Sequence, residues 1–118
     1  MNTHKNKSAL ADLSTSALVA RRARLAGQLP DVAGVLVGSL TEQTRRCGRA
    51  ECRCAGGEPH GPYAYFMPKP AGRGRARYVP AALVAAVRAG LARGEQVAAV
   101  VAEISAINAE LLARRELR

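Results

Sequence analysis

The sequence of 118 residues contains no tryptophan, one phenylalanine and three tyrosines, so aromatic residues make up only 3% of it. A hydrophobic core must therefore be built mainly from alanine, valine, leucine and isoleucine. Side chains of this size suit the close packing of helices better than the interior of a thick β-sandwich. At this length we expect one domain, over residues 9–118, with a modest core.

Long apolar runs are also missing. The polar N-terminal residues are not followed by an apolar stretch of signal-peptide length. The runs Ala81–Val87 and Val97–Ala102 are too short to span a bilayer. An odd number of cysteines in tight spacing is a poor disulfide framework, and a Cys52–Cys54 bridge would be strained. We therefore expect a cytoplasmic protein that does not enter a membrane.

Acidic side chains are scarce, because 9 Asp and Glu stand against 18 Lys and Arg and give a net charge of +9. Residues 41–80 carry eight basic and three acidic side chains, a net charge of +5. A chain this basic attracts nucleic acids, acidic proteins and anionic lipids alike. The basic side chains of this central region are Arg45, Arg46, Arg49, Arg53, Lys69, Arg73, Arg75 and Arg77.

Hydrophobic periodicity and turn residues predict an α+β fold. Its expected parts, in order, are a disordered tail at residues 1–8, an amphipathic helix at 9–29, a metal-binding loop with a β-hairpin or small sheet at 38–80, and a helical region at 81–116. Pro30 ends the first helix, and Pro80 suits the first turn of the last helical region. The core is expected to come mainly from the helices.

The C-terminal helical region has two alternatives. Gly90 and Gly94 separate two apolar stripes of different phase, so the region forms either one long bent helix or a helical hairpin. Asn108 lies beside the second stripe, where a polar residue can fix the register of a helix pair or of a dimer. A homodimer through the C-terminal helix is therefore a possible assembly.

The central region is expected to hold β-structure. Residues 38–46 predict a strand, and residues 62–67 and 75–79 predict a hairpin around a turn rich in proline and glycine. Strand alternation places Tyr63 and Tyr65 on one face, and places Tyr78 opposite Arg77. We expect the aromatic side chains to pack the hairpin against the helices, although Tyr63 and Tyr65 are also available to stack on nucleobases.

Three cysteines and a histidine lie close together as Cys47-x4-Cys52-x-Cys54-x5-His60, and the chain has no other cysteine. Thiolates and imidazole are the ligands that tetrahedral Zn²⁺ prefers, and the glycines between them allow tight turns. We expect one structural Zn²⁺ per chain, held by these four residues. The Cys-x-Cys spacing is less usual than Cys-x2-Cys, and His60 is the least secure of the four ligands.

A catalytic zinc is the sharper alternative for this cluster. It would need an open coordination position and a general base, for which Glu51 or Glu58 could be named. Both residues are more simply interpreted as solvated side chains of a loop rich in arginine. No further acid–base pair supports catalysis, so we do not expect an enzyme.

Four segments together resemble a family of short prokaryotic proteins of unassigned activity. These segments are Gly38-Ser-Leu, Arg46-Cys-Gly-Arg-Ala-Glu-Cys-Arg-Cys, His60-Gly-Pro-Tyr-Ala-Tyr and Arg77-Tyr-Val-Pro-Ala-Ala-Leu-Val. The resemblance covers about residues 38–112 and singles out Cys47, Cys52, Cys54, His60, Tyr63 and Tyr78. It implies an association with transposases or recombinases, because many members accompany their genes.

These observations favour a nucleic-acid-binding accessory protein. We expect DNA, and duplex DNA in particular, to be preferred over RNA. The eight basic side chains of the central region would contact the phosphates. A mobile element and its transposase or recombinase are the expected context. The competing hypothesis is a protein–protein adapter that docks a larger enzyme through its C-terminal helical region. In that case the positive charge would be incidental.

Overall fold

The computed structural model describes residues 10–69 and 75–118, and the chain divides into two compact units. Unit 1 is the described part of Met1–Val32 together with Glu95–Arg118, and unit 2 is the described part of Ala33–Gly94. The predicted tail at residues 1–8 lies outside the described residues. A single domain over residues 9–118 stays a prediction, and each unit is described by itself.

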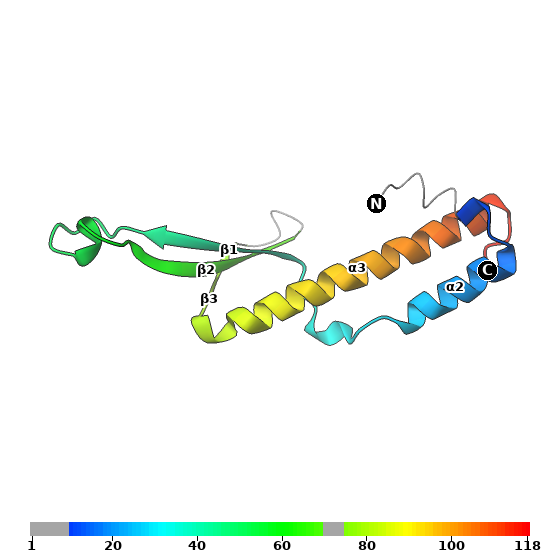
Figure 1. Cartoon of the computed structure of the whole chain (residues 1–118), viewed down its shortest axis with the longest axis horizontal. Coiled ribbons are helices and arrows are strands. Elements are labelled where there is room, and N and C mark those ends of the chain that lie inside the picture. The colour runs from blue at the N-terminus through cyan, green and yellow to red at the C-terminus, as the bar shows by residue number, and fades with distance from the viewer. Residues whose placement is uncertain (1–9, 70–74) are drawn as a thin grey trace. The chain divides into compact units, whose positions relative to one another are not determined.

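The predicted α+β fold is confirmed (Figure 1). The helices and strands are α2 (Thr15–Gly27), β1 (Gly38–Arg45), β2 (His60–Pro68), β3 (Arg77–Val79) and α3 (Val84–Ala113). Short 3-10 turns lie at Val32–Gly34, Arg53–Ala55 and Ala81–Leu83.

Helix α2 begins later than the predicted helix at residues 9–29, because Ser14 caps it. The Ser14 hydroxyl accepts a hydrogen bond of 3.1 Å from the Ala17 N–H, which satisfies one of the free donors of the first turn. A turn at residues 12–13 separates the helix from the helical residues Leu10 and Ala11. Gly27 is the last residue of α2, shortly before Pro30 as predicted.

Unit 1 holds the larger apolar core. Leu18 of α2 is fully buried against Ile107 and Leu111 of α3, which are 1% and 0% exposed. The rest of this core consists of Leu10, Leu25 and Val100, with Leu13 and Ile104 packed beside it. Arg22 of α2 donates a hydrogen bond of 2.8 Å to the side-chain oxygen of Asn108, so Asn108 joins two helices of one chain.

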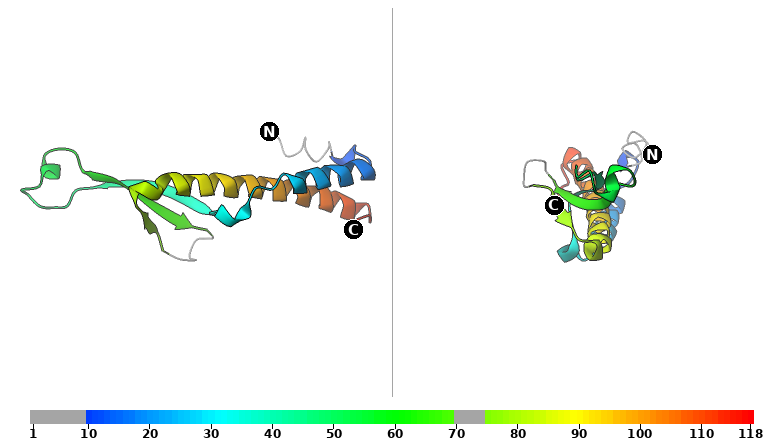
Figure 2. Two further views of the ribbon diagram at one scale, coloured as in Figure 1. Left: turned by 90° about the horizontal axis from the view of Figure 1, so that it is seen from below. Right: turned by 90° about the vertical axis from the view of Figure 1, so that its left-hand side faces the viewer.

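Unit 2 contains a three-stranded antiparallel sheet in the order β1-β2-β3 (Figure 2). Thr41 pairs with Tyr65, and Tyr65 pairs in turn with Tyr78, so side chains at these positions share one face. Ala64 and Val79 lie on the other face and are 7% and 5% exposed. The predicted hairpin is thus confirmed, with β1 added as a third strand.

Helix α3 is one continuous helix of 30 residues, so the hairpin alternative for the C-terminal region is wrong. Within unit 2, Gly90 and Gly94 let the preceding connector approach the helix. A Cβ atom at Gly90 would lie 2.9 Å from the Gly34 carbonyl oxygen, and one at Gly94 would overlap the carbonyl oxygen of Leu36. The Leu36 N–H donates to the Gly90 carbonyl oxygen at 3.0 Å. These glycines therefore serve close packing, and they do not interrupt the helix.

The apolar runs that seemed short in the sequence join in this helix. The stretch Ala81–Ala113 is, by length and composition, long and apolar enough to cross a membrane, with 17% of its most apolar window buried. Core helices of soluble proteins meet the same criterion of length and composition. This helix therefore assigns no location by itself.

Candidate metal centre and the adjoining aromatic surface

The four candidate ligands lie in and beside the loop that joins β1 to β2 (Figure 1). Cys47 follows the end of β1, and His60 is the first residue of β2, where it pairs with Arg45 across the sheet. Cys52 and Cys54 come from the loop, which makes a 3-10 turn at Arg53–Ala55. The pairing of β1 with β2 therefore brings Cys47 and His60 together. The 3-10 turn places Cys52 and Cys54 close to them.

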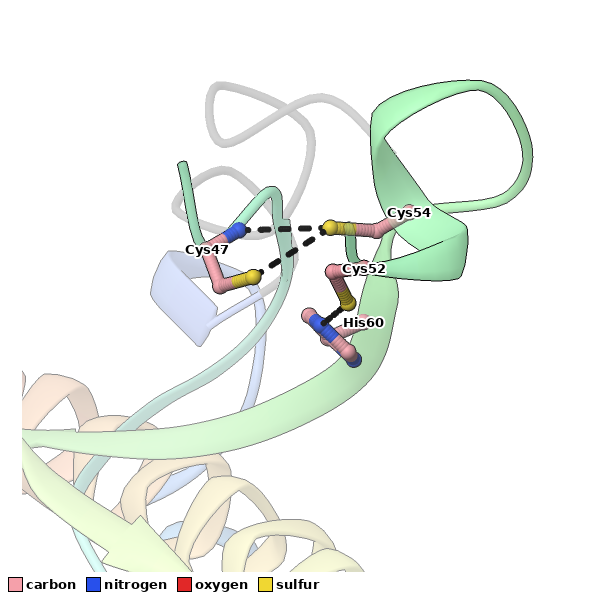
Figure 3. Close-up of side chains that lie close together, drawn as sticks. All are labelled: Cys47, Cys52, Cys54 and His60. Atoms are coloured by element: carbon pink, nitrogen blue, oxygen red, sulfur yellow. Dashed lines mark hydrogen bonds between the residues drawn. The ribbon is translucent and has the colours of Figure 1, made fainter. Parts of the chain in front are cut away.

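The ligand atoms converge on one point, as Figure 3 shows. The Cys47 and Cys54 sulfurs are 3.6 Å apart, and the Cys52 sulfur is 3.2 Å from the Nε2 atom of His60. All four ligand atoms lie within 4.8 Å of one another. A tetrahedral ion with metal–sulfur bonds of about 2.3 Å needs sulfurs about 3.8 Å apart. The four residues could therefore hold a metal ion.

Backbone N–H groups support the negative charge that such a site requires. A hydrogen bond from the Arg49 backbone, followed by contacts with His60, Cys52 and Cys54, lowers the pKa of the Cys47 thiol from 9.0 to about 6. Because a group with a pKa of about 6 is mostly ionised at neutral pH, Cys47 is prepared as a thiolate ligand.

Cys54 has the opposite environment. Its sulfur accepts a hydrogen bond of 3.4 Å from the Cys47 N–H, which favours the thiolate. That bond is outweighed, because burial and the neighbouring Cys52 and Cys47 thiols raise the pKa of Cys54 above its usual value. The side chain is 2% exposed. A cation at the centre of the cluster would offset both effects, since it favours the thiolate form of every ligand.

Arg46 braces the metal-binding loop from within. Its guanidinium donates to the carbonyl oxygen of Cys54 and, at 2.8 Å, to that of Gly57. Both bonds use one end of the planar group, so Arg46 closes the loop around the cluster. This role differs from the phosphate contact predicted for Arg46.

Arg45 is likewise engaged within the protein. Its guanidinium lies 5.8 Å from the ring centre of Tyr63 and 5.4 Å from that of Tyr65, and it donates a hydrogen bond to the Tyr65 hydroxyl. The cation therefore lies against the aromatic side chains of β2 instead of standing alone in solvent.

The remaining basic residues have different positions in unit 2. Arg49 and Arg53 lie exposed in the metal-binding loop, and Lys69, Arg75 and Arg77 lie exposed near the ends of β2 and β3. Arg73 falls outside the described residues. Of these remaining residues, Arg49 and Arg53 are thus the two that lie in the loop of the metal cluster itself.

The three tyrosines of the chain lie together on one face of the sheet. Tyr78 meets Tyr63 and Tyr65 edge to face, with ring centres 6.5 and 5.9 Å apart. Tyr78 is 57% exposed, and the face opposite it is the one that buries Ala64 and Val79. The expectation that these aromatics pack the hairpin against the helices is therefore wrong for Tyr78.

A shallow pocket of about 440 Å³ joins this aromatic surface to the metal cluster. Its lining residues are Arg45, Arg46, Cys47, His60, Tyr63, Tyr65 and Tyr78. Sequence reasoning named each of them but did not place them together. The pairing of Tyr65 with Tyr78 and of Arg45 with His60 brings these residues together. The second of these pairs follows a shift of the β1–β2 register between Gln43 and Arg45.

Comparison with known families gives one result. The model of a family described as a domain of unknown function (DUF6788) matches residues 15–89. This range starts further toward the N-terminus than the resemblance at about residues 38–112, and it includes α2, the whole sheet and the first turns of α3. No curated protein and no solved structure matches the chain.

Proposed function

The chain belongs to the family described as a domain of unknown function (DUF6788), and from its metal cluster and its basic central region we propose that it is a small zinc-stabilised protein that binds double-stranded DNA. The observation that carries this proposal is the exposed arginine pair, Arg49 and Arg53, in a loop that a metal ion would hold in one conformation. A loop already held in one conformation loses little backbone entropy when its arginines bind phosphates.

Zinc is the metal that suits these ligands best. Three thiolates and one imidazole match its preference for sulfur and nitrogen in a tetrahedral arrangement. Four protein ligands leave no open position for a reacting water, and both Glu51 and Glu58 are exposed. The ion is therefore structural in this proposal, and it organises a loop that has too few apolar side chains to fold alone.

Charge distribution supports DNA as the partner. Residues 41–80 carry a net charge of +5, and Arg49, Arg53, Lys69, Arg75 and Arg77 are all exposed. Arg45 and Arg46 are held by internal contacts and contribute to the positive field more than to direct phosphate binding. The resemblance to proteins that accompany transposase or recombinase genes extends this proposal. The protein would act in the cytoplasm, in association with a mobile element.

A second candidate function is that of a protein–protein adapter. It is favoured by the large apolar side chains left exposed on α3, where Val101 and Leu112 are 52% and 62% exposed, and on the preceding 3-10 turn, where Leu83 is 53% exposed. Ile104 also belongs to α3, but it packs against the core of unit 1. Substitution of Val101 by Gln removes an exposed apolar side chain and leaves that core intact.

The two functions are separated by fluorescence anisotropy of the zinc-loaded protein with duplex DNA, single-stranded DNA and RNA across a range of salt concentrations. We expect duplex binding that persists near physiological salt, with a log–log salt slope of about 0.9 per phosphate contact. Weak binding to all three that disappears by moderate salt would favour the adapter.

Neutralising the arginines of the hairpin tests where DNA binds. The variant Arg73→Gln/Arg75→Gln/Arg77→Gln should weaken duplex binding and lower the salt slope by about 2 to 3. The control Arg24→Gln/Arg115→Gln/Arg118→Gln removes the same charge from exposed residues of unit 1 and should change the slope far less. If both variants bind as tightly as the unmodified protein, the proposed contact surface is wrong.

A further inference from the structure

The exposed face of the sheet in unit 2 uses aromatic side chains in a place where most sheets carry polar ones. All three tyrosines of the protein lie on this face, and Tyr78 is 57% exposed. The buried residues Ala64 and Val79 lie on the opposite face. The tyrosines are therefore not needed to fill the interior on that opposite side, and their grouping calls for another explanation.

The rings in this group are not equivalent. The Arg45 guanidinium lies against both Tyr63 and Tyr65 and is tied to the Tyr65 hydroxyl, so a ligand must compete with a cation for those two rings. Tyr78 meets the same rings edge on and keeps more than half of its surface free. The ring of Tyr78 is thus the one that offers an open aromatic surface.

The pocket beside Tyr78 has the chemistry of a site for an aromatic anion. Its lining residues include the cations Arg45 and Arg46 and no carboxylate. A cationic ligand is disfavoured, because Arg45 already lies against two of the rings. A bare phosphate would interact with the arginines but would not stack on the aromatic rings. At about 440 Å³ the pocket lies within the size range of small-molecule sites.

We propose that this pocket binds one unpaired nucleobase of a bound DNA, with the base stacked on Tyr78 and the adjoining phosphate in the positive field of Arg45 and Arg46. The proposal rests on the proposed function and narrows its substrate to duplexes that carry an extrahelical base or a single-stranded end. Aromatic side chains stack on every base, so the pocket selects unpaired bases over paired ones without selecting a sequence. Because Cys47 and His60 line the pocket, the metal ion also fixes its floor.

The test uses the zinc-loaded full chain and two duplexes of equal length, one fully paired and one with a single extrahelical 2-aminopurine. We expect the second duplex to bind about tenfold more tightly, with a change in 2-aminopurine fluorescence as the base stacks. Tyr78→Ala should remove that advantage and leave affinity for the paired duplex unchanged. Tyr78→Phe, which keeps the ring, should retain the advantage.

Met67→Ala is the matched control. Met67 lies on the same face of β2 as Tyr65, is 41% exposed and does not line the pocket. It should retain the preference for the extrahelical base. Circular dichroism and zinc content of each variant establish that the sheet and the metal site persist.

Equal affinity of the two duplexes, or a preference that survives Tyr78→Ala, overturns the stacking proposal while the proposed function stands. If the protein binds no nucleic acid near physiological salt, both the proposed DNA binding and the stacking of a base on Tyr78 are wrong. A free mononucleotide added as competitor tests whether the pocket takes its base from DNA or from a free nucleotide. Binding of the mononucleotide without preference for the extrahelical duplex would overturn the assignment to DNA.

Discussion

Arg46 is a basic residue whose position gives it a structural role in the loop between β1 and β2. Its guanidinium holds the carbonyl oxygens of Cys54 and Gly57, which belong to the loop that carries the metal ligands. Groups outside the ligand set that orient a metal site influence metal affinity strongly, by about 10- to 100-fold on substitution. Arg46 should therefore matter for the metal more than for a polyanion.

The substitution Arg46→Lys separates these two roles. Lysine keeps the positive charge, but its ammonium lies on a flexible stem and lacks the rigid planar group in which one nitrogen of Arg46 faces both carbonyl oxygens. We expect zinc affinity to fall by about 10-fold or more, with the salt slope of DNA binding unchanged once zinc is saturating. Zinc affinity is measured by competition with a chromophoric chelator.

Arg49→Lys is the control, because the Arg49 contact to the Cys47 sulfur comes from its backbone and its side chain is exposed. Equal zinc affinities of the Arg46→Lys variant and the unmodified protein would show that the loop closes without this brace.

Residue types and spacing were enough to predict that Cys47, Cys52, Cys54 and His60 form one cluster that could hold a metal ion, because three cysteines and a histidine in a short segment have few other uses. The partners of Arg45 and Tyr78 could not be predicted in the same way. They depend on strand register, and the β1–β2 register is irregular between Gln43 and Arg45. A shift of one residue would turn each side chain to the other face of the sheet.

At the scale of elements, the first part of α3 is shaped by the backbone that lies against it. Gly90 and Gly94 are buried and face the connector that leads into β1. A glycine inside a helix normally costs about 1 kcal/mol relative to alanine. Here that cost is offset by the close approach of Gly34 and Leu36, which a methyl group would prevent.

Gly94→Ala should therefore destabilise unit 2 although alanine is the better helix former. The added Cβ would overlap the Leu36 carbonyl oxygen, and forced overpacking costs about 1–3 kcal/mol. We expect a lower denaturation midpoint in urea for the zinc-loaded protein.

Gly27→Ala provides the comparison in α2, because a Cβ at Gly27 has no heavy atom within 4 Å. That variant should keep its stability or gain up to about 1 kcal/mol. A gain of similar size for Gly94→Ala would show that the connector moves away at no cost.

The same glycines explain why the sequence left two alternatives for the C-terminal region. Two glycines at the point where the apolar stripe of a helix changes its phase are compatible with a bend, with a break in the helix or with a close contact to another segment. Only the position of Leu36, which belongs to a distant part of the sequence, decides in favour of the contact. The existence of α2 and of the three strands depended on local patterns. The strand bounds were predicted within about two residues, whereas α2 begins at Thr15, later than the predicted residue 9.

At the scale of the whole molecule, the two units rely on different sources of stability. Unit 1 has a core of leucine, isoleucine and valine that includes three side chains with no more than 1% exposure. Among the described residues of unit 2, the buried side chains are Cys54, Ala64 and Val79. Small buried side chains contribute little hydrophobic free energy, so unit 2 should depend on its metal ion.

Removal of zinc should accordingly act on one unit. With a strong chelator, backbone amides in residues 45–60 should exchange with deuterium much faster, while those of α2 keep their protection. Hydrogen exchange followed by mass spectrometry resolves the two segments, and readdition of zinc should restore the slow exchange. An equal loss of protection in α2 would mean that the metal stabilises both units.

Unit 1 is assembled from two segments that the whole of unit 2 separates in the chain, and this has a consequence for biosynthesis. Leu18 is synthesised before all of unit 2, whereas Ile107 and Leu111, the residues that cover it, are synthesised after all of unit 2. Unit 2 has all its residues available sooner, and under the proposed function it would need only a zinc ion from outside the chain. We therefore expect unit 2 to fold first during translation, with the apolar face of α2 uncovered until Ile107 and Leu111 have been synthesised.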